Sequence, residues 1–546
     1  MNARVMINKI NEYSKACVEI AEAILELEPG SKEEIAKIKK EISRKYRLPK
    51  LPADPDILTS FRERFGECNE LVQLKSLLRL KPVRTISGVA VVSVMTSPAP
   101  CPHGKCVPCP GGVEIGTPQS YIGLEPAAQR GRQHGYDAFK QVSARLKELS
   151  EIGHDVDKVE IIVMGGTFPA RKREYRDRFI LDIFNALNCF GSRAKPEGDL
   201  EKAKRKNEKA KARCVGLTIE TRPDFSKREH ILEMLRYGAT KVELGVQSVY
   251  DDVLNLIRRG HSVADSIEAT KLLKDSAFKV GYHVMPGLPG SSFDRDIEMF
   301  KKLFSNENFK PDYLKIYPTL VVEGTELYEW WKAGEYRPYT TGEVVELIAR
   351  AKRYLPEWVR VQRIQRDIPV KHAIGLEKGN IRQLVHEKLK EYGYECRCIR
   401  CREVGHKLRR LGVKLSSDEI EKQAELVVRK YKASKGVEYF ISYELADYDA
   451  LVGFIRLRFP HEPFIDALKD AALIRELHVY GKAVPIGGRD TEAFQHRGFG
   501  EKLLREAEEI AKEKYDRIAV ISGVGVREYY RRFGYRKKFE YMVKKL

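Results

Sequence analysis

The segment CPHGKCVPCPGG, residues 101–112, is the most informative stretch of this chain. Four residues separate Cys101 from Cys106, and two separate Cys106 from Cys109. The Pro and Gly residues between and after the cysteines predict a loop. Three thiolates that converge from one loop can hold three irons of a 4Fe–4S cluster and leave the fourth iron open. Radical enzymes bind S-adenosylmethionine at such an open iron, so the segment predicts both groups.

Two other interpretations of these cysteines compete with the cluster. Zinc normally takes four ligands, and His103 could supply the fourth ligand of a structural zinc knuckle. The three thiols could also be unrelated residues of one loop. Ligand count favours the cluster, and the sequence that follows the loop strengthens this interpretation.

Length and composition predict two or three domains with large buried cores. The chain has 546 residues, of which 42% are hydrophobic and 32% are charged. No apolar run approaches the ~20 residues that span a bilayer, and the first residues lack an apolar signal-peptide core. We therefore expect a cytoplasmic protein, in which clustered cysteines favour metal binding over disulfides.

The positive charge is concentrated in separate segments. The net charge is +20, and residues 32–50, 202–213 and 397–410 are each strongly basic. A broad basic surface predicts a nucleic-acid partner, and we expect contacts to it from two groups of basic residues. These are Lys37, Lys39 and Lys40 in the N-terminal segment and Arg360, Arg363 and Arg366 in RVQRIQR. The alternative is solvated helix faces in a protein rich in Lys and Glu.

The first ~80 residues have the apolar spacing of helices, at residues 11–27 and 31–46. We expect a small basic helical segment at 1–80. From about residue 83 the pattern changes to alternating strands and helices, which predicts a parallel sheet. The strand candidates are residues 85–96, 158–166, 214–221, 241–248, 279–287 and 312–320.

Six or so strand–helix units with a curl make a partial barrel, which we place at residues 81–375. Ligands in such barrels lie at the carboxyl ends of the strands. The cysteine loop, the Gly-Gly of MGGTF and Glu220 all fall there. Residues 192–213, SRAKPEGDLEKAKRKNEKAKAR, have the composition of a basic mobile insertion.

Several residues near the strand ends are candidates for contacts with the cofactor. Gly165 and Gly166 allow close approach of the backbone to a ligand, and Thr167 follows them. Glu243 and Gln247 in ELGVQS could contact a ribose or the substrate. A polar strand edge without such a role is the alternative for the last two residues.

A connector at residues 376–420 carries a second cysteine cluster, Cys396, Cys398 and Cys401. Close spacing of cysteines is typical of a structural zinc site. The fourth ligand could be His406, His372, Cys189 or Cys214. Redox thiols or an incidental cluster are the alternatives, because the spacing is not that of standard zinc knuckles.

The last segment, residues 421–546, begins a new α/β pattern. QHRGFG, residues 495–500, leads into an amphipathic helix whose first amides could bind a pyrophosphate. Gln495, Gly498 and Gly500 fit the Q/R-x-x-G-x-G/A signature of GCN5-related acetyltransferases. In that fold the strand equivalent to RELHVYG diverges from its neighbour. A phenol of Tyr529 or Tyr530 could act on the thioester, although aromatic core packing would also explain them.

Motifs along nearly the whole chain resemble those of the Elongator catalytic subunit family, in its archaeal form. They are CPHGKCVPCPGG, EIIVMGGTF, LTIETRPD, ELGVQSVYDDVL, HVMPGLPG, KIYPTLVVEGTELYEWW, IQRDIP, RELHVYG, QHRGFG, AVISGVGVREYYRRFGY and YMVKKL. The resemblance implies an α/β fold: a partial (β/α) TIM-like radical S-adenosylmethionine barrel, then a GCN5-related acetyltransferase domain, with a small helical N-terminal segment.

The resemblance also implies an activity. The family modifies the wobble uridine of the tRNA anticodon, using a 4Fe–4S cluster, S-adenosylmethionine, acetyl-CoA and an electron donor. A 5′-deoxyadenosyl radical would take hydrogen from the acetyl methyl group, and the acetyl carbon would add to carbon 5 of uracil. Thioester hydrolysis would then leave a carboxymethyl group. The contacts to acetyl-CoA implied by the family motifs are Lys158, Glu476, Leu477, His478, Val479, Phe499, Gly500, Glu501 and Tyr530.

Two other functions are compatible with parts of the sequence. Protein lysine acetylation needs the acetyltransferase domain but no cluster. An RNA-binding scaffold needs neither site, and the intact cysteine triplet and QHRGFG turn argue against it. The basic segments favour a tRNA substrate, because a protein acetylase has no need of them.

Overall fold

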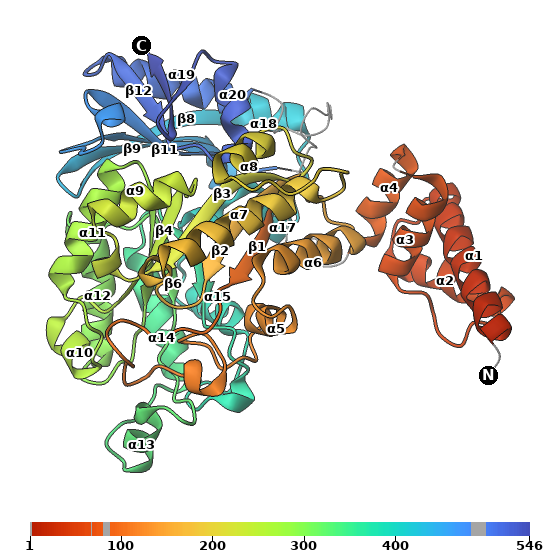
Figure 1. The fold of residues 1–546 in the computed structure, drawn as a ribbon, viewed down its shortest axis with the longest axis horizontal. Coiled ribbons are helices and arrows are strands. Elements are labelled where there is room, and N and C mark those ends of the chain that lie inside the picture. Colours follow the sequence, from red (N-terminus) through yellow and green to blue (C-terminus); the bar gives the residue numbers. More distant parts are fainter. Residues whose placement is uncertain (1–2, 67, 80–87, 482–497) are drawn as a thin grey trace.

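The computed structural model describes residues 3–66, 68–79, 88–481 and 498–546. Figure 1 shows three parts in chain order: a group of N-terminal helices at one side, a large central barrel, and a C-terminal sheet packed on one end of the barrel. The expected α/β architecture is confirmed, because a parallel barrel sheet is followed by a second mixed sheet. Among the described residues, no helix is long and apolar enough to cross a membrane.

The N-terminal helices form a small body with a hydrophobic core of its own. They are α1 (Ala3–Leu27), α2 (Lys32–Lys45), α3 (Asp54–Phe65) and α4 (Asn69–Leu78). Ser31 caps α2 by accepting a hydrogen bond from the Glu34 amide at 3.2 Å, as the sequence pattern predicts. Two arginines reach the barrel: Arg62 bonds the Ser150 carbonyl and Arg79 bonds that of Gly153.

Seven parallel strands form the barrel sheet in the order β1 to β7. They are β1 (Ala90–Met95), β2 (Lys158–Met164), β3 (Arg213–Thr221), β4 (Lys241–Gln247), β5 (Lys279–Val284), β6 (Tyr313–Ile316) and β7 (Arg360–Ile364). The six predicted strands are present. The seventh, β7, is the segment RVQRI, which the sequence pattern indicated only as a source of positive charge.

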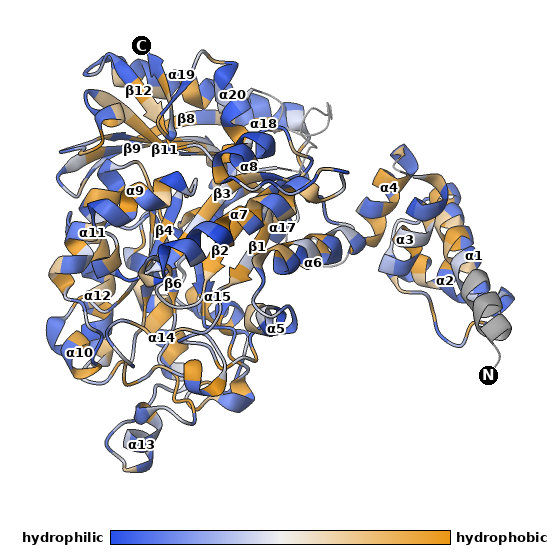
Figure 2. Cartoon of the chain, viewed as in Figure 1, coloured by the Kyte–Doolittle hydropathy of each residue, from blue (hydrophilic) through white to orange (hydrophobic). Residues whose placement is uncertain are grey.

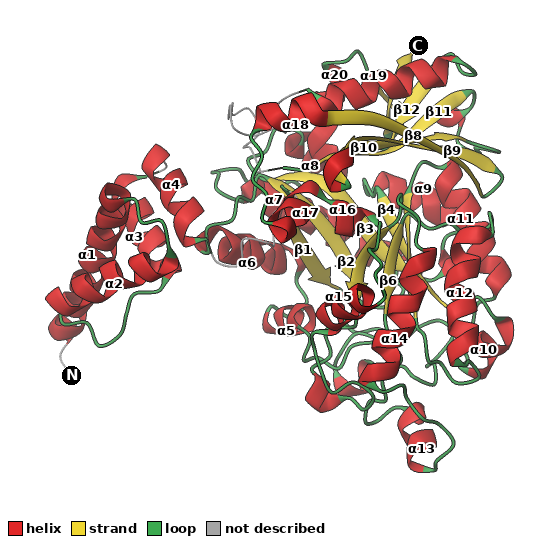
Figure 3. Cartoon of the chain, turned by 180° about the vertical axis from the view of Figure 1, so that it is seen from behind, coloured by secondary structure: helices red, strands yellow, loops and turns green. Residues whose placement is uncertain are grey.

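Helices cover the outer face of the barrel, as Figure 3 shows from behind. They are α5 (Pro126–Gln133), α6 (Ala138–Glu151), α7 (Arg173–Cys189), α8 (Leu200–Asn207), α9 (Arg228–Arg236), α10 (Asp251–Leu256), α11 (Val263–Asp275), α12 (Phe293–Ser305) and α14 (Thr341–Ala351). The short helix α13 (Glu326–Lys332) projects away from one end of the barrel. Side chains alternate along each strand. In β2, Val159, Ile161 and Val163 are buried in the main core. Figure 2 shows apolar residues concentrated on the strands and hydrophilic residues on the outer helix surfaces.

The connector after the barrel is helical and leads into the second sheet. It contains α15 (Ile381–Glu391), α16 (Ile399–Arg402), α17 (Val404–Leu411) and α18 (Ser417–Gln423). The second sheet has the order β13-β14-β12-β11-β10-β9-β8. Its elements are β8 (Ala424–Ala433), β9 (Gly436–Leu445), β10 (Ala450–Phe459), β11 (Ala471–Val479), α19 (Phe499–Lys512), β12 (Arg517–Val520), α20 (Arg527–Arg531), β13 (Arg536–Lys538) and β14 (Tyr541–Lys545).

Buried ion pairs join the second sheet to the amino ends of the barrel strands. Asp312, just before β6, accepts hydrogen bonds from both terminal nitrogens of Arg475 on β11, at 2.7 and 2.6 Å. Arg475 also donates to Glu438 of β9 at 2.9 Å. All three side chains are at most 1% exposed. Desolvated charges of this kind require their partners, so they fix how the two sheets dock.

The basic insertion at residues 192–213 is ordered, which corrects the prediction of a mobile segment. It contains α8, and Lys204 in that helix is fully buried. The Lys204 ammonium donates to the Arg236 carbonyl at 2.7 Å and to Glu540 at 3.1 Å. Nearby, Glu208 pairs with Arg531 of α20 at 2.7 Å. Part of this positive charge therefore serves the contact between the two sheets.

Candidate functional site

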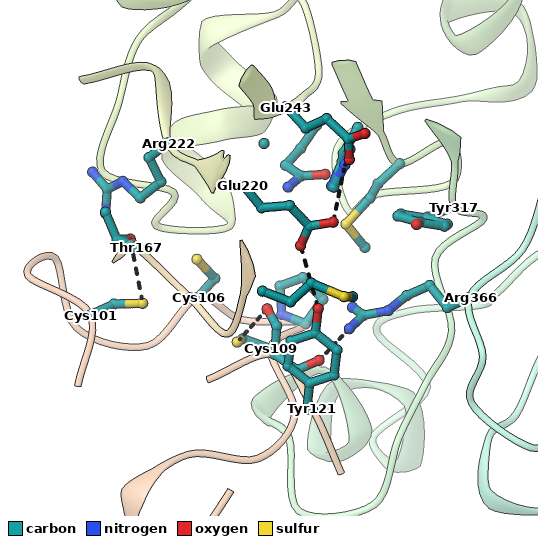
Figure 4. A pocket seen from close by; sticks show the side chains of 18 of the residues that line it. Cys101, Cys106, Cys109, Tyr121, Thr167, Glu220, Arg222, Glu243, Tyr317 and Arg366 are labelled. Carbon is teal, nitrogen blue, oxygen red and sulfur yellow. Dashed lines mark hydrogen bonds and ion pairs between the residues drawn. The ribbon is translucent and has the colours of Figure 1, made fainter. Parts of the chain in front are cut away.

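The three cysteines of the loop after β1 line one pocket together with Gly166 and Thr167, as Figure 4 shows. Cys106 and Cys109 are buried, and Cys101 is partly exposed. The Gln119 amide nitrogen lies 3.4 Å from the Cys109 sulfur. Three soft sulfur donors in a single pocket match the ligand set of a 4Fe–4S cluster with one open iron.

Both glycines of MGGTF have the left-handed backbone that favours glycine. Gly165 has φ 119° and Gly166 has φ 86°. A Cβ on Gly165 would lie 2.3 Å from the Thr96 hydroxyl oxygen, which donates a hydrogen bond to the Gly165 carbonyl at 2.9 Å. A Cβ on Gly166 would be 3.9 Å from the Cys101 sulfur. The turn therefore brings bare backbone to the edge of the cysteine pocket.

Four buried polar atoms of residues that line the pocket have no hydrogen-bond partner among the described residues. They are Thr221 Oγ1, Arg222 Nη1, Gln247 Oε1 and Arg259 Nε. Gln247 also has a left-handed backbone, with φ 66°. Buried polar groups are rarely left unpaired, so these atoms are placed to meet a polar ligand. Gln247 was predicted, whereas Thr221, Arg222 and Arg259 were not.

Charged side chains fill the barrel interior below the pocket. The Lys315 ammonium lies 2.8 Å from Glu220 and also pairs with Glu243, while Lys241 pairs with Glu160 at 2.7 Å and Glu243 at 3.4 Å. Burial alone would raise the pKa of Glu243, but the two ammonium groups hold it well below its usual range. Glu243 is therefore an ionised, fully buried part of this network.

His283 joins the same network, with its Nε2 3.0 Å from Glu243 and 3.9 Å from Glu220. Two carboxylates and an imidazole at this spacing resemble a metal site. The Lys315 ammonium, however, already pairs with both carboxylates, and Lys241 pairs with Glu243 as well. We therefore interpret this group as an ion-pair network that lines the pocket.

In the second sheet, the pairing of β11 with β12 ends at Ile474, and we call this divergence the candidate cleft. In the described part of the chain, β11 pairs with β12 only over Ala471–Ile474, whereas its pairing with β10 continues to Val479. The divergence lies at the predicted residues Leu477, His478 and Val479. Glu476 was also predicted to contact acetyl-CoA, but its carboxylate is already paired. It accepts hydrogen bonds from Arg456 at 2.8 Å and from the Tyr313 hydroxyl of the barrel.

Helix α19 begins beside this cleft. Its N-cap residue is Gly498, with φ 76°. Glycine has no side chain, so no N-cap side chain accepts a hydrogen bond from the first amides of α19. Phe499 is buried against Tyr443, and Glu501 pairs with Arg505 along the helix. Gln495 lies outside the described residues.

The two candidate tyrosines lie next to the start of α19. The Tyr529 hydroxyl is 2.7 Å from the position that a Cβ on Gly500 would take. Tyr530 is buried and packs edge-on against Tyr529 and Tyr535. Burial raises the pKa of Tyr529 to about 12, so its phenol is protonated at neutral pH. Tyr529 is therefore the more accessible phenol of the pair, and Tyr530 also supports the core.

Alanine at Gly500 tests this arrangement. We expect the new methyl group to displace the Tyr529 hydroxyl without unfolding the protein, and to weaken acetyl-CoA binding about tenfold, or about 1.4 kcal/mol. Titration calorimetry with acetyl-CoA measures the change. Alanine at Gly198, which has nothing within 4 Å of its Cβ position, is the matched control. Unchanged affinity in the Gly500→Ala variant would contradict the placement of the site.

The cysteine pocket and the second sheet lie at opposite ends of the barrel strands. The cysteine pocket is at the carboxyl ends of the strands, and the second sheet docks at their amino ends through Asp312 before β6 and Arg360 at the start of β7. Lys158, a predicted acetyl-CoA contact, is the first residue of β2 and lies at the amino-terminal edge. The charged network of Glu160, Lys241 and Lys315 lies between the sites.

The predicted RNA-binding residues divide into three groups. Lys37 and Lys40 are exposed on α2, whereas Lys39 is paired with Asp54 at 2.9 Å. Arg363 and Arg366 line the cysteine pocket. Arg360 has another role than the one predicted: it is held by Glu403 at 2.9 Å and by the Tyr480 hydroxyl at 2.6 Å, inside the contact between the two sheets.

The second cysteine cluster is assembled as predicted. The sulfurs of Cys396, Cys398 and Cys401 lie within 4.8 Å of one another, and all three residues are buried. The Lys352 ammonium is 3.2 Å from the Cys396 sulfur. No His, Asp, Glu or further Cys of the described chain joins this set. The predicted fourth ligands therefore lie elsewhere, for instance Cys214 inside β3 and Cys189 at the end of α7.

Sequence reasoning did not single out several residues that line the pocket with the cysteines. They are Tyr121, Arg222, Arg259, His283 and Tyr317. Arg222, His283 and Tyr317 lie inside motifs quoted above, but no role was predicted for them. His283 lies within β5 and Tyr317 directly follows β6, so their place near the carboxyl end of a strand was a usable signal. Tyr121 lies in the loop after the cysteines and had no such signal.

Comparison with known families agrees with this architecture. Four family profiles match: the ELP3 N-terminal domain at residues 13–86, the Radical SAM superfamily at 99–303, the Radical_SAM C-terminal domain at 311–391 and the Acetyltransferase (GNAT) family at 412–535. The match at 99–303 includes the cysteine loop and the Gly-Gly turn. It favours the cluster over the zinc knuckle.

Relatives of similar length match almost the entire chain. A "tRNA uridine(34) acetyltransferase" of Methanocaldococcus infernus is 49% identical over 94% of this chain and 96% of its own. "Elongator complex protein 3" of Homo sapiens is 44% identical over 100% of this chain and 98% of its own. The solved structure of the M. infernus Elp3 with an N-terminal deletion has a TM-score of 0.74 and 46% identity, covering 85% of this chain and 100% of that one. The chain therefore belongs to the Elp3 family, which joins a radical SAM barrel to a GNAT acetyltransferase domain.

Proposed function

We propose that this chain modifies uridine at the wobble position of tRNA, attaching a carboxymethyl group from acetyl-CoA to carbon 5 of the base. The observation that carries the proposal is a three-cysteine pocket at the carboxyl ends of the barrel strands, with a sheet of the GNAT family docked at their amino ends. Relatives that are 48–49% identical and are named tRNA uridine(34) acetyltransferases support the substrate.

At the cysteine pocket, Cys101, Cys106 and Cys109 would hold a 4Fe–4S cluster with S-adenosylmethionine. These groups, when bound, supply a 5′-deoxyadenosyl radical that takes hydrogen from the acetyl methyl group. The chain's own residues would hold and orient these groups. The Gln119 amide donates to the Cys109 sulfur, and the Gly-Gly turn lets the backbone approach the bound ligand. The unpaired atoms of Gln247 and Arg222 would bind polar groups of S-adenosylmethionine.

At the cleft, the amides at the start of α19 would bind the pyrophosphate of acetyl-CoA, because a helix N-terminus attracts anions. The edge of β11 at Leu477, His478 and Val479 would lie along the pantetheine arm. The protonated phenol of Tyr529 could donate to the thioester sulfur or carbonyl during hydrolysis. This hydrolysis would follow addition of the acetyl carbon to uracil, so the thioester would stay intact until then.

Label transfer tests the reaction directly. The assay contains anaerobically reconstituted protein, S-adenosylmethionine, a reductant, tRNA and acetyl-CoA labelled in its methyl group. We expect label in a modified uridine of tRNA, and none when S-adenosylmethionine is omitted. Label on a protein substrate, with none in tRNA, would contradict the proposal and favour a protein lysine acetyltransferase.

Basic side chains on α2 are proposed to contact the tRNA backbone. Glu in place of both Lys37 and Lys40 should weaken tRNA binding and lower the slope of log K against log salt by about 0.7–0.9 per lost phosphate contact. Filter binding over a salt series measures this. Lys39→Gln is the matched control, because Lys39 is already paired with Asp54 and should contribute less. Unchanged affinity at low salt would exclude these contacts.

We also propose a zinc ion at Cys396, Cys398 and Cys401. Three buried thiols within 4.8 Å of one another supply three of the four ligands usual for structural zinc. Metal analysis of purified protein should find one zinc that is lost in Cys398→Ser. Full zinc content in that variant would contradict the site.

A further inference from the structure

One half of the cysteine pocket has a composition unlike the rest. Figure 4 shows Cys101, Cys106, Thr167 and Arg222 at one side, and Tyr121, Tyr317 and Arg366 at the other, with Glu220 between them. The first side carries two of the three sulfur ligands and the unpaired Nη1 of Arg222, and Cys109 lies closer to Tyr121. The second side has two aromatic rings, a guanidinium and a carboxylate, which is a set suited to a planar polar ring.

The carboxylate of Glu220 is fixed but retains open acceptor positions. Its Oε1 accepts from the Lys315 ammonium at 2.8 Å, and its Oε2 lies 3.5 Å from the Tyr121 hydroxyl. A carboxylate offers about four acceptor positions, so two are still available. The side chain is 12% exposed, and that exposure is toward the pocket that it lines. Glu220 therefore presents a charged hydrogen-bond acceptor to a molecule inside the pocket.

Flat side chains flank this acceptor. The Arg366 guanidinium lies 5.9 Å from the Tyr121 ring centre and 6.0 Å from that of Tyr317. A hydrogen bond from Arg366 to the Ser120 carbonyl holds the guanidinium in place. Both rings are partly exposed. Unpaired bases in RNA are bound by stacking on aromatic rings and on guanidinium planes.

We propose that Glu220 selects uracil by accepting a hydrogen bond from N3–H of a flipped-out base that lies against Tyr121, Tyr317 and Arg366. Uracil has a proton on N3, whereas neutral cytosine has a lone pair there. The Glu220 carboxylate, paired with Lys315, would accept a hydrogen bond from the proton and would be repelled by the lone pair. Enzymes that act on a base commonly flip it into a pocket and read its Watson–Crick edge in this way. The inference rests on the proposed function, and it identifies the residue that sets base preference.

Binding of short RNAs tests the selection without turnover. The probes are three anticodon stem-loops that differ only at the wobble position, which is uridine, cytidine or abasic. Anaerobic fluorescence anisotropy with the reconstituted protein and S-adenosylmethionine gives each Kd. We expect wild type to bind the uridine RNA about tenfold or more tightly than the other two, and Glu220→Gln to bind uridine and cytidine RNAs within about twofold, because an amide can both donate and accept.

Glu160→Gln is the matched control, because Glu160 is also paired with a barrel lysine but does not line the pocket. It should keep the wild-type preference for uridine. Equal binding of all three RNAs by wild type, or an unchanged preference in Glu220→Gln, would overturn the selection by Glu220 while leaving the proposed function standing. Failure of wild type to bind any of the three would contradict the proposed function itself.

Discussion

Alanine at Cys101, Cys106 and Cys109 together is expected to reduce transfer of the acetyl label to tRNA by at least about 1,000-fold, or about 4 kcal/mol. The three thiols are the soft donors in the pocket, and the described cysteines outside the loop lie in other parts of the fold. Without them the pocket cannot anchor a cluster, so no radical would form. Iron content and visible absorption should fall with the activity.

The acetyltransferase half should survive these substitutions. Its candidate residues on β11 and α19 are not among those that line the cysteine pocket. Acetyl-CoA affinity should therefore match that of wild type. Cys214→Ala is the matched control, because it also removes a barrel thiol, inside β3 and away from the loop. Label in tRNA from the triple variant would eliminate the radical mechanism.

Strands could be predicted from the sequence wherever buried apolar residues alternated with residues of the other face. In β2, Val159, Ile161 and Val163 alternate with residues of the interior face, and this pattern identified the strand. The pattern failed for β7, because RVQRI contains two arginines and a glutamine and reads as a charged surface segment. The interior of this barrel is ionic, so charge in a strand did not mean exposure to solvent.

The site was predictable only in part, because local motifs do not show which distant segments meet in the folded chain. Short motifs revealed the cysteines and the Gly-Gly turn, because their function depends on local spacing. The wall formed by Tyr121, Glu220, Tyr317 and Arg366 comes from four separate segments that meet only in three dimensions. Charge was equally ambiguous in sequence: Arg360 and Lys204 looked like ligands for RNA, yet both are paired within the contact between the two sheets.

Replacement of Asp312 is expected to be the most destabilising change at that contact. The carboxylate accepts two hydrogen bonds from Arg475 and one from the Val280 amide at 2.8 Å, and all of this is buried. Burial alone would raise its pKa, but Arg475 and Lys274 hold it far below the usual range. Alanine would remove one of the two carboxylates that compensate the buried positive charge of Arg475. Removing one partner of a buried pair costs about 3–5 kcal/mol, because the other charge remains desolvated.

A loss of that size should lower the melting temperature of Asp312→Ala by roughly 10 °C, given about 2–4 °C per kcal/mol for domains of 150–250 residues. The second sheet should also become susceptible to proteolysis at lower temperature, since this ion pair fixes its docking on the barrel. Glu391→Ala removes the exposed partner of Lys388 and should cost under about 1 kcal/mol, which makes it the control. The proposed reaction needs both sheets in their docked arrangement. Asp312→Ala should therefore also lose label transfer to tRNA, while acetyl-CoA binding and cluster assembly persist below the melting temperature. Retention of both stability and label transfer would show that the docking does not depend on this buried charge.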